Sequence, residues 1–255
     1  MAGTGSSPSP RYTVGEAMGW AWKTFAKNAR PLVLATLIVG IVGVLLGTLL
    51  GPLLQAVSPE TFTAVQSGGP IVETASRTIT GGGMAVLGLA WLVLLIVGGV
   101  IAAAWYRGLL AIADGEPVSV GSFLKPHNAV SVILASLIIG GLTGAAGLIA
   151  VLAPYVGALL SALIAGLVAF VTFFTIVAIV DRRLSPIDGI RAGLHLFRAN
   201  PGPVVLAWIV STAVVVAGAL VCGGLLAAVP IAYLFKVVTW RRLSGGSVAP
   251  APQGE

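Results

Sequence analysis

Long apolar stretches without a charged residue alternate with short polar segments along the chain. The charge-free stretches cover residues 31–59, 78–106, 129–180 and 199–235. Because a helix needs about 20 apolar residues to cross the hydrocarbon core of a bilayer, the last two are long enough for hairpins. Turns are expected at Ala153–Pro154–Tyr155 and at Cys222–Gly223–Gly224. The pattern therefore predicts about six spans, at residues 31–57, 83–106, 129–152, 155–180, 203–221 and 223–240.

The fold class that follows is an all-α, polytopic transmembrane helix bundle. Residues 13–242 form the predicted membrane domain, and residues 1–12 and 243–255 are predicted to be disordered cytoplasmic tails because they are rich in Ser, Pro and Gly. Residues 58–82 are the one outer connection with charged residues. The fifth and sixth spans are short, and a single long re-entrant segment is the alternative for residues 203–240.

The distribution of positive charge gives an orientation. The chain has 14 Lys and Arg residues, and all except Arg77 lie in segments that a six-span topology places on one side. Cytoplasmic loops retain an excess of Lys and Arg, so we expect a protein of the cell membrane with both termini in the cytoplasm. This reading also accounts for the net charge of +6 without nucleic-acid binding.

The chain contains an internal repeat. Residues 13–35 align without gaps to residues 185–207 at an offset of 172, and the alignment pairs Thr13 with Ser185 and Asn28 with Asn200. A looser third copy begins at Ser119 and contains Asn128, but it requires a deletion of six residues. The predicted unit is an amphipathic segment followed by a two-span hairpin.

Each complete copy predicts a short amphipathic helix at the membrane surface. Thr13 and Glu16 form a capping-box pattern, and Ser185 followed by Pro186 and Asp188 has the same role. The expected apolar face of the first helix consists of Val14, Ala17, Met18, Ala21, Trp22 and Phe25, and that of the second of Ile187, Ile190, Leu194 and Phe197. The basic residues expected to contact anionic lipid head groups or a protein partner are Lys23, Lys27, Arg30, Arg191 and Arg198.

The sequence offers little for catalysis, and we expect no enzyme, cofactor or metal site. His127 and His195 are not accompanied by Cys or clustered carboxylates. Asp114 and Glu116 fit an ordinary turn, and Asp181 fits the charged end of a helix. Apart from Lys236, which is close enough to the inner end to snorkel, no ionisable residue lies within a predicted span, which disfavours an ion-coupled pump.

Three motifs resemble a known group of proteins. They are VGEAMGWAWKTFAKNARPL, PIDGIRAGLHLFRANPGPV and, after the second span, DGEPVSVGSF. With these motifs, residues 12–242 resemble bacterial six-span membrane proteins related to the membrane-anchoring domain of glycerophosphodiester phosphodiesterases. The resemblance implies a membrane architecture; no catalytic domain is expected here, so the phosphodiesterase activity does not carry over.

The function that the sequence favours is non-enzymatic. We expect an integral membrane protein that organises envelope lipids or a membrane complex through its basic interfacial helices, at residues 14–28 and 187–200. The expected partners are the bilayer, anionic lipid head groups and a membrane protein or a second copy of the chain. The alternative is a transporter or channel for a small or amphiphilic molecule, which would pass between the repeated hairpins.

Overall fold

The computed structural model describes residues 12–57, 60–65, 72–77, 81–152 and 154–252 of the protein. Each predicted span corresponds to helix in this structure. The α-helices are α1 (Val14–Lys27), α2 (Ala29–Val57), α3 (Gly81–Ala113), α4 (Ala129–Leu152), α5 (Pro154–Val171), α6 (Thr175–Arg182), α7 (Pro186–Ala199), α8 (Pro201–Ala219) and α9 (Leu225–Leu243). The described residues also form a 3-10 helix, η1 (Val120–Phe123), and two strands, β1 (Glu60–Val65) and β2 (Val72–Arg77).

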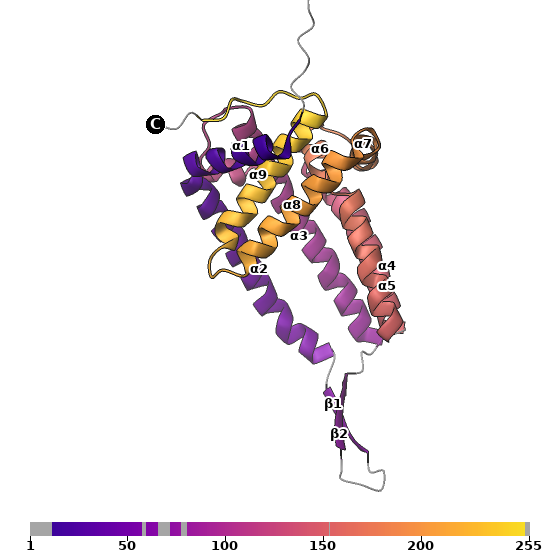
Figure 1. The fold of residues 1–255 in the computed structure, drawn as a ribbon. Coiled ribbons are helices and arrows are strands. Elements are labelled where there is room, and N and C mark those ends of the chain that lie inside the picture. The colour runs from indigo at the N-terminus through magenta and orange to yellow at the C-terminus, as the bar shows by residue number, and fades with distance from the viewer. Residues whose placement is uncertain (1–11, 58–59, 66–71, 78–80, 153, 253–255) are drawn as a thin grey trace, which may run out of the picture.

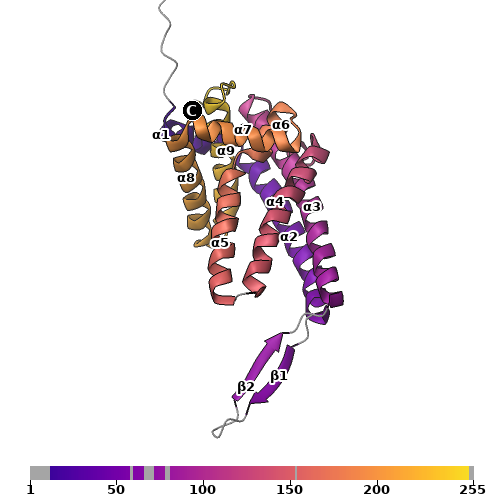
Figure 2. The same cartoon turned by 90° about the vertical axis from the view of Figure 1, so that its right-hand side faces the viewer.

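The long helices run side by side, and the two short amphipathic helices lie across one end of them. In Figure 1, α1 crosses the top of the bundle, and in Figure 2, α7 crosses the same end. We call this end, which also holds the α3–α4 connection and the end of α9, the basic end. The β1–β2 hairpin lies at the opposite end (Figure 1).

Five helical segments are long and apolar enough to cross a membrane: Ala29–Leu50, Ala85–Ala113, Ala129–Ile149, Val156–Arg182 and Pro201–Ala219. The first, with 22 residues, extends about 33 Å at 1.5 Å per residue, which exceeds the hydrocarbon thickness of about 30 Å. The all-α polytopic fold class is therefore confirmed. The predicted sixth span corresponds to α9, whose last two turns carry Lys236, Arg241 and Arg242, and it is not among the five.

Buried side chains are concentrated at the basic end. The core there contains Trp105 of α3, Phe174 before α6, and Phe235 and Trp240 of α9, all nearly inaccessible to solvent. Farther from this end the helices expose large apolar side chains such as Leu49 of α2. This distribution is typical of helices that meet lipid tails, because lipid is as apolar as the side chains and does not drive the helices together.

The fourth predicted span is divided into two helices. The segment after α5 forms turns, in which the Thr172 hydroxyl donates to the Val168 carbonyl at 2.6 Å, and α6 begins only at Thr175. The break places Phe173 and Phe174 against α9: Phe174 packs on Trp240, and Phe173 lies beneath the Lys236 ammonium. The predicted span at residues 155–180 still corresponds to one segment long and apolar enough to cross a membrane, Val156–Arg182, and the break lies within it.

The connection between α2 and α3 contains a β-hairpin that the sequence pattern did not indicate. β1 and β2 pair in antiparallel register from Glu60↔Arg77 to Val65↔Val72. Their residues belong to the polar segment 58–82, so this strand pair is an addition to the helical bundle and leaves its fold class unchanged.

The three copies of the repeat share a hydrogen bond at the start of the first long helix, although Asn128 of the third copy has a φ of 52° whereas Asn28 and Asn200 have negative φ values. In each copy an asparagine precedes the first long helix, and its carbonyl accepts a hydrogen bond from the amide four residues on. The Leu32 amide donates to the Asn28 carbonyl at 3.2 Å, the Val132 amide to the Asn128 carbonyl at 3.2 Å, and the Val204 amide to the Asn200 carbonyl at 3.1 Å. Three residues after each donor stands a buried alanine: Ala35, Ala135 and Ala207. The three segments thus share this hydrogen bond and the buried alanine, and the three-fold use of the unit stays a prediction.

The carboxyl-terminal segment is attached to the basic end over its described part. The Ala249 amide donates to the Ala113 carbonyl at 2.8 Å, and the Ala249 carbonyl accepts the Trp20 indole N–H at 2.9 Å. Val248 and Ala251 pack against the core. The structure thus differs from the predicted disorder of residues 243–255 as far as residue 252, whereas the tail 1–11 lies outside the described residues.

Candidate functional site

Helix α1 is fixed on the basic end by one narrow face. It begins where the Thr13 hydroxyl accepts the Glu16 amide at 3.4 Å, as the capping pattern predicts. Trp20 on the buried face is only 4% exposed, whereas Trp22 is 61% exposed. The buried positions follow Ala17 at spacings of three, four and seven residues, so Trp22 of the predicted apolar face does not pack on the protein.

Helix α7 repeats this arrangement at the offset of 172 residues. Ser185 caps it by accepting the Asp188 amide at 3.2 Å. Its buried residues, Gly189, Gly193 and Leu196, are the equivalents of Ala17, Ala21 and Thr24 in α1. A Cβ atom at Gly189 would meet the Ile179 Cγ1 atom at 2.3 Å, so glycine is needed for this close approach. Ile187 of the predicted apolar face is exposed, as Trp22 is in α1.

The five basic residues predicted as contacts are all exposed. Lys23, Lys27 and Arg30 follow one another from α1 into α2, and Arg191 and Arg198 lie on α7. Arg191 forms an exposed ion pair with Asp188 at 3.4 Å. For the other four, no ion pair occurs among the residues that the structure describes. The two groups belong to separate helices at the same end, so they present two patches and not one cluster.

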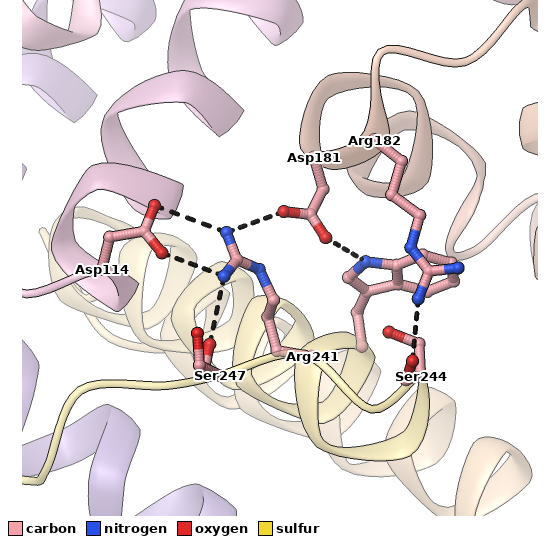
Figure 3. A network of polar contacts seen from close by, with 7 residues as sticks. Asp114, Asp181, Arg182, Arg241, Ser244 and Ser247 are labelled. Carbon is pink, nitrogen blue, oxygen red and sulfur yellow. Dashed lines mark hydrogen bonds and ion pairs between the residues drawn. The ribbon is translucent and has the colours of Figure 1, made fainter.

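An ion-pair network that we did not predict joins the ends of three helices (Figure 3). The Arg241 guanidinium of α9 contacts Asp114, directly after α3, at 2.9 Å and Asp181 of α6 at 2.7 Å. It also donates to the Ser247 carbonyl at 3.1 Å. The Arg241 side chain is 12% exposed and that of Asp181 is 9% exposed. A guanidinium suits this position because its planar fork can donate to two carboxylates at once.

The aromatic ring next to Arg241 extends the network. The Trp240 indole N–H donates to the second oxygen of Asp181 at 2.8 Å. The Arg182 guanidinium lies 5.1 Å from the centre of the Trp240 ring and donates to the Ser244 carbonyl at 2.8 Å. Both oxygens of Asp181 are therefore occupied, which is the condition for keeping a carboxylate at a largely buried position.

A polar cleft of about 220 Å³ lies beside this network. It is lined by Arg107, Asp114, Glu116, His127, Asp181 and Arg183, among others. Partial burial and the positive charges of Arg183 and Arg107 lower the pKa of His127 below its ordinary value of 6.5. Among the described residues, no three His, Cys, Asp or Glu side chains are grouped closely enough to hold a metal ion.

Sequence reasoning missed this network because its members are far apart in the chain. Asp114 was interpreted as part of a turn, and Asp181 as a helix end. A signal was present: the second helix of each repeat unit ends near a charged residue, at Asp114, Asp181 and Arg241. In a three-fold arrangement of hairpins these ends meet at one point. The sequence also did not indicate that the Lys236 ammonium lies over the rings of Tyr106 and Phe173.

The fold and the apolar helices define a multi-pass α-helical membrane protein with a duplicated amphipathic helix at one end. The chain is similar to the uncharacterized protein Mb2590 of Mycobacterium bovis, with 34% identity over 247 residues that cover 95% of this chain and 72% of the relative. It is similar to the uncharacterized protein Rv2560 of Mycobacterium tuberculosis, with 32% identity over 246 residues and the same coverage. The chain therefore belongs to the family of these mycobacterial proteins.

Two further comparisons add no relative. No protein-family model matches the chain. No solved structure matches it significantly. The printed names of the mycobacterial relatives state no activity. The resemblance to the anchoring domain of the phosphodiesterases therefore stays a prediction.

Proposed function

We propose that the protein is a non-enzymatic component of the cell membrane that organises envelope lipids or a membrane complex through α1 and α7. The observation that carries the proposal is the equivalent burial of the two helices. Each buries the same three repeat positions and leaves its basic residues exposed. A duplicated contact that only fixed the chain to the bundle would not need exposed cations in both copies.

The orientation in this proposal places the basic end in the cytoplasm. Among the described Lys and Arg residues, Arg77 alone lies at the opposite end, in β2. The cytoplasmic leaflet carries anionic lipid, and a basic residue near its surface contributes about 1 kcal/mol to binding. Helices α1 and α7 lie across the bundle end, as an interfacial helix does (Figures 1 and 2). Their exposed apolar side chains Trp22 and Ile187 would then enter the boundary between head groups and acyl chains.

The test is charge reversal followed by a measurement of bound lipid. The four substitutions Lys23→Glu, Lys27→Glu, Arg191→Glu and Arg198→Glu are combined in the full chain. Native mass spectrometry in detergent then compares retained phosphatidylglycerol with retained phosphatidylcholine. We expect the variant to lose its preference for the anionic lipid, since each basic residue accounts for about a fivefold change in affinity.

A control keeps the change in net charge comparable. The pair Arg107→Glu and Lys125→Glu alters exposed cations at the same end but outside both helices, and it is compared with the pair Lys23→Glu and Lys27→Glu. The proposal predicts that only the α1 pair reduces retention of anionic lipid. Partner recovery after purification in mild detergent is measured in parallel. If the fourfold variant keeps both its lipid preference and its co-purifying proteins, the proposal is wrong.

A transporter or channel is the second candidate function. One observation favours it: a cavity lies between α2, α3, α6 and α9. Movement of a solute into liposomes by the purified protein would support this candidate. If the purified protein binds lipid but moves no candidate solute, transport is contradicted and the organising role remains as the proposed function.

A further inference from the structure

The cavity between α2, α3, α6 and α9 has the properties of a ligand site. Its volume is about 320 Å³, within the range of about 300–1,000 Å³ that is common for small-molecule sites. Its lining is apolar and aromatic, with Trp105, Tyr106 and Tyr233 among its residues, and Lys236 supplies its one cation. Apolar walls with a single charged group are suited to an amphiphile.

Lys236 is held inside this cavity by aromatic rings. Its ammonium lies 4.4 Å from the centre of the Phe173 ring, 5.4 Å from that of Tyr106 and 5.6 Å from that of Tyr233. These distances fall within the range of cation–π contact, about 6 Å. Among the residues that the structure describes, no carboxylate pairs with Lys236. The rings orient the ammonium and leave its charge without a counter-ion.

Lys236 lies close to the charged end of α9. It stands five residues before Arg241 on α9, which corresponds to about 7.5 Å along the helix. An ionisable residue at such a depth is expensive to retain unless it has a role.

The mouth of the cavity opens between α2 and α3 toward the lipid side. Val39 of α2 and Gly98 of α3 both line the cavity and are both exposed. The floor is formed by Trp105 and Tyr106, which are buried in the core of the basic end. An acyl chain could thus leave past Val39 and Gly98 while its head group reaches Lys236.

We propose that this cavity binds one anionic amphiphile, with its carboxylate or phosphate on Lys236 and its acyl chain passing between α2 and α3. The inference deepens the proposed function by giving the lipid a specific site. This inference rests on the proposed function only in taking an anionic lipid as the class of ligand. The surface residues of α1 and α7 do not line the cavity, so the two proposals can fail separately.

The experiment titrates the full-length protein in a non-ionic detergent with single-chain probes. Oleate supplies a carboxylate, oleoyl lysophosphatidylglycerol supplies a phosphate, and oleoyl lysophosphatidylcholine is the zwitterionic control. Native mass spectrometry counts the bound molecules. We expect one tightly bound oleate or lysophosphatidylglycerol, and the tighter of these two identifies the head group. Affinity should fall at least tenfold in Lys236→Met and be retained in Lys236→Arg.

A second variant tests the mouth without changing a charge. A Cβ atom at Gly98 meets no atom within 4 Å, so Gly98→Phe can be accommodated while it narrows the opening. Gly88→Phe is the matched control, because Gly88 lies on the same helix, also has open space and does not line the cavity. Only Gly98→Phe should weaken binding of the anionic probe.

The outcomes separate the two proposals. The cavity site is supported if Lys236→Met loses binding of the anionic probe and Lys23→Glu/Lys27→Glu retains it. This result does not depend on whether the cations of α1 and α7 also contact lipid. Equal binding of all three probes that is insensitive to Lys236→Met overturns it, since the site would then recognise only an acyl chain. No binding to the wild type also overturns it, while a preference for anionic lipid that depends on Lys23 and Lys27 would leave the proposed function standing.

Discussion

Removal of the Arg241 guanidinium is expected to be the most destabilising single change in the polar network. Arg241 bridges Asp114 and Asp181, and the Asp181 side chain is only 9% exposed. In Arg241→Met, Asp181 would keep its charge and lose its cation, with only the Trp240 N–H left to it. Breaking a buried pair in this way costs about 3–5 kcal/mol. Because Asp114 is 42% exposed and can be solvated, we expect the lower value, about 3 kcal/mol.

The assay is thermal unfolding of the detergent-purified protein, followed by tryptophan fluorescence at one fixed scan rate. For a chain of this size, 1 kcal/mol corresponds to about 2–4 °C, so the unfolding midpoint should fall by about 6–12 °C. Arg242→Met is the matched control. Its ion pair with Glu16 spans 3.6 Å between side chains that are 31% and 64% exposed, and such surface pairs contribute less than about 1 kcal/mol. The control should therefore shift the midpoint by less than about 4 °C.

A double variant examines the physical cause. In Asp181→Asn/Arg241→Met no uncompensated charge remains beside Trp240, while an amide oxygen can still accept the indole N–H. The double variant should unfold at a higher temperature than Arg241→Met alone. The reasoning is refuted if Arg241→Met and Arg242→Met shift the midpoint equally, or if the two changes at Asp181 and Arg241 simply add.

Three further predictions concern the basic end. Gly189→Ala should destabilise the protein by about 1–3 kcal/mol, because its Cβ would meet the Ile179 side chain at 2.3 Å. Gly15→Ala, in the matching amphipathic helix, has open space and should be neutral or stabilising in the same thermal assay. Trp20→Phe removes the N–H that binds the Ala249 carbonyl, so amide hydrogen exchange should become faster in residues 247–252, whereas Trp22→Phe should leave it unchanged. The lowered pKa of His127 means that the folded state takes up its proton less readily than the unfolded state. The contribution of the neutral imidazole to stability is therefore present above about pH 6.5, and it is lost as the pH falls through the lower pKa of the folded state. We expect His127→Gln to unfold at a higher temperature than the wild type near pH 5 and at the same temperature near pH 8.

The helices were predictable from the sequence because their signals are local. Charge-free apolar runs determine α2, α3 and α4, and the caps Thr13 and Ser185 determine where α1 and α7 begin. The apolar faces predicted for α1 and α7 do not by themselves say which residues the protein buries. An apolar side chain at a membrane surface can face either lipid or protein, and periodicity alone does not distinguish Trp20 from Trp22.

The site was less predictable because it depends on contacts between distant segments. The Arg241 network joins residues 114, 181 and 241, and nothing in their immediate neighbours indicates an ion pair. The break before α6 similarly depends on where Phe173 and Phe174 pack. By contrast, the exposure of Lys23 and Arg198 was predictable, since both follow from helical periodicity once the caps are known.

The repeat explains why charges and packing are concentrated at one end. In every unit an asparagine elbow starts the first helix there, and the second helices α3, α6 and α9 end there in the network of Asp114, Asp181 and Arg241. The units are therefore joined at the basic end, while farther away their helices expose apolar side chains to lipid. The cavity of Lys236 lies just beyond this joint, and its walls come from all three units, through α2 and α3 of the first, α6 of the second and α9 of the third. A lipid bound there would contact all three units at once, so we expect its binding to restrict their relative movement. The exposed cations of α1 and α7 lie at this same end, where the three units are joined.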